Sequence, residues 1–232
     1  MTSEELAKYI DHTILKPQST VNDVLSACDE AIKHRFATVF VNSYFVPFVK
    51  KKLKGTSVDV GTVVGFPLGA SSTVAKCFEA ASSVLSGANE IDMVINLGLL
   101  KTGNIDEVYL DIAAVVEAAH SAKQEVNLRN VIVKVIVEAC YLTNDEKKRA
   151  AETVKNAGAD FVKTSTGFGP GGAKVEDVEL LKKVVGDNVG IKASGGIKTY
   201  EQALAMIEAG ATRIGTSSGV EIMEGFLKKG KD

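Results

Sequence analysis

Residues 131–139 read Val-Ile-Val-Lys-Val-Ile-Val-Glu-Ala, and this β-branched run decides how the chain folds. β-Branched residues favour strands, and the side chains of a strand point alternately to its two faces. Valine therefore fills one face of this segment, whereas Lys134 and Glu138 lie on the other. Such a strand fits a barrel, in which one face meets surrounding helices and the other lines the interior.

The same kind of segment recurs along the whole chain, and a helical pattern follows each one. The predicted strands span 10–15, 37–42, 57–66, 90–96, 131–139, 160–166, 190–194 and 213–216. The predicted helices span 21–33, 46–53, 73–86, 105–122, 145–157, 175–185, 200–209 and 220–227. Eight such units in 232 residues predict a (β/α)8 TIM barrel with a short N-terminal helix, a single catalytic domain over 1–232. An open doubly wound sheet, which usually has fewer strands, is the alternative.

The composition is that of a soluble globular protein. Its 27 basic and 29 acidic residues give a net charge of −2, and this balance does not favour binding to nucleic acid or an anionic membrane. No apolar run approaches the roughly 20 residues of a membrane span, and the polar N-terminus does not resemble a secretion signal. The three cysteines lie far apart, as is typical of reduced thiols. We therefore expect a cytoplasmic protein without nucleic-acid or membrane partners.

Charged side chains occupy the inward faces of four predicted strands. These residues are Asp92, Lys134, Lys163 and Lys192. Burying a charge is costly unless it is paired, so structural ion pairs or lysines that extend to the strand ends explain any one of them. Their convergence from four strands instead favours a catalytic cluster, because the carboxyl ends of barrel strands carry active sites.

Closely placed lysines are typical of Schiff-base chemistry. A lysine must be neutral to attack a carbonyl, and a free lysine has a pKa of about 10.4. Burial or a second cation favours the neutral form, and an aspartate can move protons. The three histidines are isolated and show no metal-ligand spacing. We therefore expect no metal and no cofactor.

Glycine-rich segments follow the last three predicted strands, at 164–172, 194–197 and 215–219. Small residues before a helix let backbone N–H groups approach an anion, and the phosphate site of such barrels often follows strands seven and eight. Ordinary tight turns are the alternative for any one segment. Residues 167–172 also match the dinucleotide pattern GxGxxG, but the next strand brings Lys192 where that motif needs an acidic residue.

Seven motifs resemble the deoxyribose-phosphate aldolase family, which consists of class I aldolases on a TIM barrel. The motifs occur in family order and cover nearly the whole chain. They are Asp11-His-Thr-Ile-Leu-Lys16, Val64-Gly-Phe-Pro-Leu-Gly69, Glu90-Ile-Asp-Met-Val-Ile-Asn96, Val133-Lys-Val-Ile-Val-Glu138, Phe161-Val-Lys-Thr-Ser-Thr-Gly-Phe168, Ile191-Lys-Ala-Ser-Gly-Gly196 and Arg213-Ile-Gly-Thr-Ser-Ser218.

The resemblance implies reversible cleavage of 2-deoxy-D-ribose 5-phosphate to acetaldehyde and D-glyceraldehyde 3-phosphate. Lys163 matches the Schiff-base lysine, Lys192 the second lysine that favours its neutral form, and Asp92 the aspartate of the proton relay. The expected substrate- and phosphate-binding residues are Asp11, Thr13, Lys134, Thr166, Gly167, Gly171, Gly172, Gly195, Gly196, Gly215, Ser217 and Ser218. A homodimer or homotetramer is expected, because most members form one.

Two departures from the family pattern concern phosphate binding and proton transfer. Some members carry a phosphate-contacting lysine where this chain has Phe168, and some have a C-terminal tyrosine that residues 228–232 lack. Two other functions fit the same residues. A sugar-phosphate isomerase would form no imine, and a non-catalytic sugar-phosphate binder would bind without turnover. Trapping with borohydride separates the aldolase from both.

Overall fold

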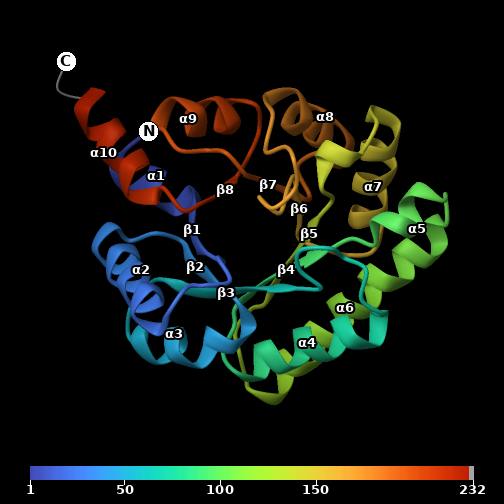
Figure 1. Ribbon diagram of the computed structural model, residues 1–232, viewed down its shortest axis with the longest axis horizontal. Coiled ribbons are helices and arrows are strands. Elements are labelled where there is room, and N and C mark those ends of the chain that lie inside the picture. Colours follow the sequence, from blue (N-terminus) through green and yellow to red (C-terminus); the bar gives the residue numbers. More distant parts are fainter. Residues whose placement is uncertain (230–232) are drawn as a thin grey trace.

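Eight parallel strands close into a barrel, and helices surround it (Figure 1). The computed structural model describes residues 1–229. Each strand pairs with the next, and β1 also pairs with β8. The strands are β1 (Ile10–Ile14), β2 (Thr38–Val41), β3 (Asp59–Val64), β4 (Glu90–Val94), β5 (Ile132–Ile136), β6 (Phe161–Lys163), β7 (Gly190–Ser194) and β8 (Arg213–Thr216). The predicted TIM barrel is confirmed, and the open sheet is excluded.

Helices alternate with the strands as predicted. They are α1 (Ser3–Tyr9), α2 (Val21–His34), α3 (Val46–Lys52), α4 (Thr73–Leu85), α5 (Leu97–Lys101), α6 (Ile105–Glu125), α7 (Asn144–Asn156), α8 (Val175–Val185), α9 (Tyr200–Glu208) and α10 (Gly219–Lys229). Two 3-10 turns, η1 (Ser43–Phe45) and η2 (Ala139–Tyr141), complete the fold. The expected N-terminal helix, α1, begins with a capping box between Thr2 and Glu5. The sequence did not predict α5, because five residues are too few to show a helical period.

The apolar core lies between the strands and the helices. Val133, Val135 and Val137 are fully buried, and they alternate with Lys134, which is also fully buried. The strand thus buries both faces, one against helices and one inside the barrel, as its alternation predicts. The ionic groups on the inward faces are therefore surrounded by the barrel wall and the apolar layer outside it.

None of the helices within residues 1–229 is long and apolar enough to cross a membrane. The expectation about the missing C-terminal tyrosine concerns residues 228–232, of which 230–232 lie outside the described part.

Candidate active site

Lys163 and Lys192, on two neighbouring strands, share one carboxylate oxygen. The Lys163 Nζ donates to Asp92 Oδ2 at 2.8 Å, and the Lys192 Nζ donates to the same oxygen at 2.6 Å. Lys163 ends β6, Lys192 lies on β7, and the two are paired in the strand register. Their side chains and that of Asp92 are almost completely buried. The structure therefore brings together the three residues that the sequence predicted to be catalytic.

A second ionic layer lies deeper in the barrel. Lys134 pairs with Glu90 and lies 3.3 Å from Asp92 Oδ1. Arg213 Nη1 lies 2.6 Å from Asp11 Oδ1 and 3.0 Å from Glu90 Oε1. Asp11 Oδ2 lies 2.6 Å from the Lys192 Nζ and so joins the two layers.

The seven ionic groups of the two layers do not balance in charge. Four cations, from three lysines and Arg213, face three carboxylates, from Asp11, Glu90 and Asp92. Loss of one proton from a lysine would make the cluster neutral. A buried excess charge is costly, so this arrangement favours a neutral amine among the lysines.

Burial and charge shift the pKa values of these groups in opposite directions. Burial lowers the pKa of Lys192 to about 8, although Asp11 and Asp92 oppose that shift. Burial alone would raise the pKa of Asp92, but three lysine charges outweigh it and hold that pKa well below its usual range. Burial would likewise raise the pKa of Asp11, which Lys192, Arg213 and Lys134 lower to about 2. Both aspartates are therefore carboxylates at neutral pH.

The aromatic ring of Phe40 lies close to the amines of two lysines, Lys192 and Lys134. The Lys192 Nζ lies 3.6 Å from the centroid of the Phe40 ring, and the Lys134 Nζ lies 4.7 Å from it. The face of an aromatic ring attracts a cation. On the other side of Lys192, a Cβ on Gly215 would come within 2.8 Å of its side chain. Glycine at this position of β8 therefore makes room for the lysine.

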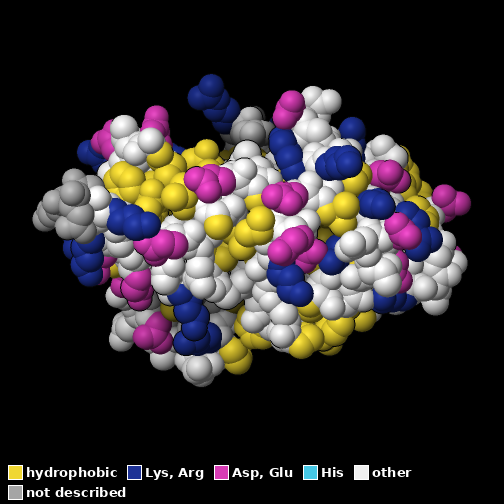
Figure 2. Space-filling view, turned by 90° about the horizontal axis from the view of Figure 1, so that it is seen from above, with side chains coloured by type: hydrophobic (Ala, Val, Ile, Leu, Met, Phe, Trp, Pro, Cys, Tyr) yellow, Lys and Arg dark blue, Asp and Glu magenta, His cyan; other side chains and the backbone are white. Residues whose placement is uncertain are grey.

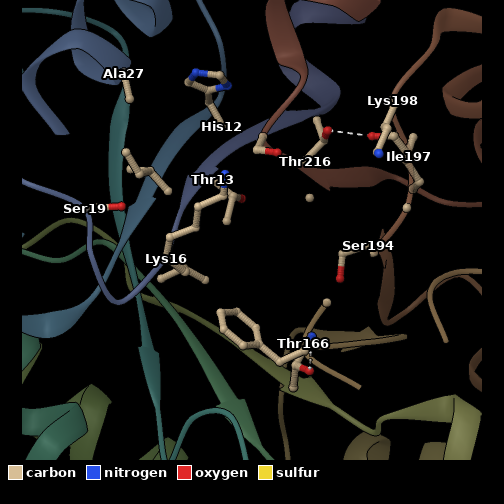
Figure 3. Close-up of a pocket in the computed structure, with 18 of the residues that line it drawn as sticks. His12, Thr13, Lys16, Ser19, Ala27, Thr166, Ser194, Ile197, Lys198 and Thr216 are labelled. Carbon is tan, nitrogen blue, oxygen red and sulfur yellow. Dashed lines mark hydrogen bonds between the residues drawn. The ribbon is translucent and has the colours of Figure 1, made fainter. Parts of the chain in front are cut away.

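A cavity of about 740 Å³ opens above Lys163. Figure 3 shows Thr13 and Lys16 on one side of it, with Ser194 and Thr166 across from them. Eight of the predicted site residues line this cavity. They are Thr13, Lys163, Thr166, Gly167, Gly195, Gly196, Gly215 and Ser217.

The other predicted site residues do not line the cavity. Asp92, Lys192, Asp11 and Lys134 are fully buried and are not among the lining residues. Gly171, Gly172 and Ser218 are also absent from the lining. A Cβ on Gly172 would meet Gly195 O at 2.1 Å, so this glycine is needed for close contact between two loops.

The β6–α8 loop is held by a buried carboxylate. The backbone N–H of Thr166 donates to Glu138 at 3.3 Å, and the Thr166 hydroxyl also donates to that carboxylate. Glu138 itself has a left-handed backbone with φ of 49°, which is unusual for a residue other than glycine. This constraint fixes Thr166 at the edge of the cavity.

A comparison with known families matches residues 5–225 to the DeoC/LacD family aldolases. The match spans the whole barrel and includes all eight strands. The chain belongs to the DeoC/LacD aldolase family.

Named proteins that are similar to the chain are consistent with this family. The deoxyribose-phosphate aldolase of Thermococcus gammatolerans is 57% identical over 227 residues, which cover 97% of this chain and 98% of that protein. A solved structure of a putative deoxyribose-phosphate aldolase from Coccidioides immitis has a TM-score of 0.91 and 39% identity, covering 98% of this chain and 87% of the other. The deoxyribose phosphate aldolase of Aeropyrum pernix, described as a unique tetrameric structure, has a TM-score of 0.89 and 32% identity, covering 98% and 93%.

Two lysines that line the cavity of this aldolase, Lys16 and Lys198, were not predicted from the sequence, and they bring cations to its rim. Ser194 and Thr216 bring hydroxyl groups; they lie in the predicted glycine-rich segments but were not singled out there. The positions of the two lysines in the sequence, Lys16 just after a strand and Lys198 just after a glycine pair, are the only features that could have indicated them. This indication is weak, because lysines are common in loops. His12 also lines the cavity, but its Nε2 lies 2.7 Å from Glu30 and its ring packs on Phe36, and both contacts fit a structural role.

Proposed function

We propose that the chain is a class I deoxyribose-phosphate aldolase. It would cleave 2-deoxy-D-ribose 5-phosphate reversibly to acetaldehyde and D-glyceraldehyde 3-phosphate in deoxyribose phosphate breakdown, as a single catalytic domain. One observation carries the proposal. The amine of Lys163 lies at the cavity floor and contacts the Asp92 carboxylate, which the amine of Lys192 also contacts. This is the set of groups that imine formation and proton transfer need.

In the proposed reaction, Lys163 is the nucleophile. Its neutral amine attacks the C1 aldehyde of the open-chain sugar, and loss of water leaves an iminium. Removal of the C3 hydroxyl proton then breaks the C2–C3 bond. The C3–C5 fragment leaves as glyceraldehyde 3-phosphate, and the electron pair of the broken bond forms an enamine. Protonation of the enamine at C2 and hydrolysis of the resulting iminium release acetaldehyde and regenerate the lysine.

Asp92 is proposed to move protons in these steps, because its Oδ2 contacts both amines. Its Oδ1 lies 3.3 Å from the Lys134 Nζ but accepts no hydrogen bond among the described residues. Lys192 is proposed to act through its charge. With Lys134 and Arg213 it balances the three carboxylates, so a proton on Lys163 would leave one positive charge unmatched, which favours the neutral form of Lys163.

The phosphate is proposed to bind at the rim formed by the β6–α8, β7–α9 and β8–α10 loops. Gly195 and Gly196 have positive φ and line the cavity, and Ser217, which also lines it, lies near the N-terminus of α10. Lys198 and Lys16 supply cations at the same opening. These side chains compensate for the absence of a lysine at Phe168.

The function is tested by two measurements on one preparation. Acetaldehyde release from 2-deoxy-D-ribose 5-phosphate reports the overall reaction, and mass spectrometry after acetaldehyde and borohydride reports the imine as an ethylated lysine. Only an aldolase that forms an imine gives both. An isomerase or a non-catalytic binder would give no ethylated lysine, and such a result would overturn the proposal.

Replacing Lys192 by Leu is expected to move the pH dependence of imine formation to higher pH. Three cations then face three carboxylates, and this balance retains the proton on Lys163. Lys192→Arg keeps the positive charge and should keep the parent profile. The measurement is the rate of borohydride-trapped product as a function of pH with acetaldehyde alone. A Leu variant whose profile coincides with the parent's would show that Lys192 does not act electrostatically.

Activity is expected to survive exhaustive chelation of metal ions. The iminium already accepts the electron pair of the broken bond, so a Lewis acid is redundant. Asp11, Glu90 and Asp92, the three carboxylates of the ionic cluster, are instead engaged by Lys or Arg. The measurement is turnover after prolonged dialysis against EDTA, with and without added Zn²⁺. Loss of turnover that Zn²⁺ restores would indicate a metal-dependent mechanism.

The chain is proposed to be a cytoplasmic homodimer or homotetramer. A phosphorylated sugar is charged and stays inside the cell, which supports a cytoplasmic location. The tetrameric relative from Aeropyrum pernix supports self-association.

A further inference from the structure

Phe168 places an aromatic ring in the wall of the cavity. It is 52% exposed and lines the cavity, two residues after Thr166 in the β6–α8 loop. Figure 3 shows Thr166 across the cavity from Lys16. Exposed apolar residues are common on protein surfaces, and Figure 2 shows apolar areas interspersed with charged side chains over α8 and α9. Phe168 differs from these because it borders the space that a bound substrate would occupy.

The ring of Phe168 packs against a second aromatic ring. The centroids of Phe66 and Phe168 lie 5.2 Å apart, and their planes meet at 87°, which is an edge-to-face arrangement. The Phe168 N–H also donates to the Thr166 hydroxyl at 3.0 Å. Phe66 belongs to segment 64–69, one of the seven sequence motifs, and this segment lies outside the lining of the cavity. We therefore expect any effect of Phe66 on a substrate to pass through Phe168.

Close backbone contacts hold the loop that carries Phe66. The Gly65 N–H donates to Glu79 Oε2 at 2.8 Å, and the Gly69 N–H donates to Gly65 O at 2.8 Å. A Cβ on Gly69 would meet Ile95 O at 2.0 Å, so the loop packs directly on the chain just after β4. A ring on such a loop keeps its position, as a residue that positions another must do.

A buried ion pair fixes the helix that follows this loop. The Lys76 side chain is fully buried, and its Nζ donates to Asp111 Oδ2 at 2.6 Å and to Val94 O at 3.0 Å. The Thr73 hydroxyl donates to the other oxygen, Asp111 Oδ1, at 2.8 Å. These contacts tie α4 to α6 and to the end of β4. The loop of Phe66 therefore joins two elements that are themselves fixed.

Within residues 1–229, the part of the cavity wall formed by the β6–α8 loop carries no charged side chain. This loop contributes Thr166, Gly167 and Phe168 to the lining. The charged lining residues come from the floor, from α2 and the segment before it, and from the β7–α9 loop. They are Lys16, Asp23, Glu30, Lys163 and Lys198. A substrate bound to Lys163 therefore has cations on some sides and an apolar ring on another.

We propose that Phe168 is a specificity-determining residue for the aldehyde that the enamine on Lys163 attacks, and that Phe66 positions its ring. In the direction of synthesis, C2 of the enamine bonds to the carbonyl carbon of this aldehyde, whose oxygen takes up a proton. Water then hydrolyses the iminium and releases the hydroxyaldehyde.

The rest of the aldehyde extends from the cavity floor toward the opening. An apolar chain there would cover the exposed ring of Phe168, and burial of apolar surface is favourable. A phosphate would instead lie near the cations of Lys16 and Lys198. The proposal rests on the proposed aldolase function, because it needs the enamine on Lys163.

A competition between two aldehydes tests the proposal. Butanal, which has an apolar chain, and D-glyceraldehyde 3-phosphate are offered together with acetaldehyde, and mass spectrometry measures the initial rates of 3-hydroxyhexanal and 2-deoxy-D-ribose 5-phosphate formation. The ratio of these products reports the ratio of the two kcat/KM values, whatever fraction of the enzyme is folded. Phe168→Ser should lower the ratio of 3-hydroxyhexanal to sugar phosphate at least about 10-fold, as lost apolar contacts do in other enzymes. Phe168→Leu keeps an apolar side chain and should retain most of the parent ratio.

Phe66→Leu tests the positioning role. Loss of the edge-to-face contact should lower the same ratio about 2–10-fold in the parent. It should have no further effect in Phe168→Ser, because two changes that act through one contact are not additive. The control is Leu227→Ser, at an apolar position on α10 that is 50% exposed and lies outside the cavity lining, and it should keep the parent ratio.

An unchanged ratio in Phe168→Ser, or a parent that forms no 3-hydroxyhexanal, would overturn the role of Phe168. An equal effect of Phe66→Leu in both backgrounds would overturn the positioning role of Phe66. Borohydride trapping of the parent with acetaldehyde alone distinguishes these failures from failure of the proposed function, because no second aldehyde takes part in imine formation. A trapped imine with an unchanged ratio overturns only the inference about Phe168, whereas absence of the trapped imine overturns both.

Discussion

Lys163→Met should abolish aldol cleavage, with a loss of at least about 10⁴-fold in turnover, as removal of a covalent nucleophile typically produces. Methionine has a similar length and no charge, so it fills the space without offering an amine. The fold should persist, because Asp92 keeps its contacts with Lys192 and Lys134. Acetaldehyde release from 2-deoxy-D-ribose 5-phosphate measures the loss.

The control for this substitution is Lys174→Met, which removes an exposed lysine from the loop after the same strand. It should leave turnover unchanged. In the parent, digestion after borohydride treatment should find the ethyl group on the peptide that contains residues 161–166. Ethylation at Lys134 or Lys192 instead, or ethylation that persists in Lys163→Met, would refute the assignment of the nucleophile.

The strand alternation predicted which charged side chains meet inside the barrel, but not how deep along the barrel axis each of them lies. Each residue of the cluster lies on the inward face of its strand, and this follows from a period of two. Depth depends on the stagger between strands, which a side-chain pattern does not encode. Lys134 is level with Asp92 in the register, whereas Lys163 is level with Ile136, two residues farther along β5. Lys134 therefore lies one layer below the reactive amine, and its predicted contact with substrate could not be checked from the sequence.

The loops were predicted less well than the strands. Segment 160–166 was predicted as one strand, but β6 ends at Lys163, because the following residues turn to bond neighbouring loops. The Thr164 hydroxyl donates to Ser194 O, and the Thr166 hydroxyl donates to Glu138. These are contacts between distant parts of the chain and leave no periodic signal. Lys16 and Lys198 were missed at the cavity rim for the same reason.

Asp92→Asn should lower turnover by about 10²–10⁴-fold over the whole pH range, the usual contribution of a general acid–base group. Asparagine keeps the size of the side chain but cannot take up a proton. The charge count predicts that imine formation itself survives: four cations would face two carboxylates, which favours a neutral Lys163 still further. In this variant turnover should therefore fall while the imine can still be trapped with borohydride. In Lys163→Met, both turnover and the trapped imine should be lost.

Exchange of the methyl protons of acetaldehyde isolates the step assigned to Asp92. The imine and the enamine interconvert by moving a proton at C2, so deuterium from the solvent enters the methyl group without any acceptor aldehyde. NMR should show this exchange slowed in Asp92→Asn in proportion to turnover. Glu90→Gln is the matched control: it removes an equal charge from the cluster, but Glu90 contacts Lys134 and Arg213 rather than Lys163. If both variants exchange as fast as the parent, the Asp92 carboxylate does not transfer this proton. If both are slowed equally, loss of charge is sufficient to explain the effect. Slow exchange in Asp92→Asn alone assigns the proton transfer to the carboxylate that touches the amine.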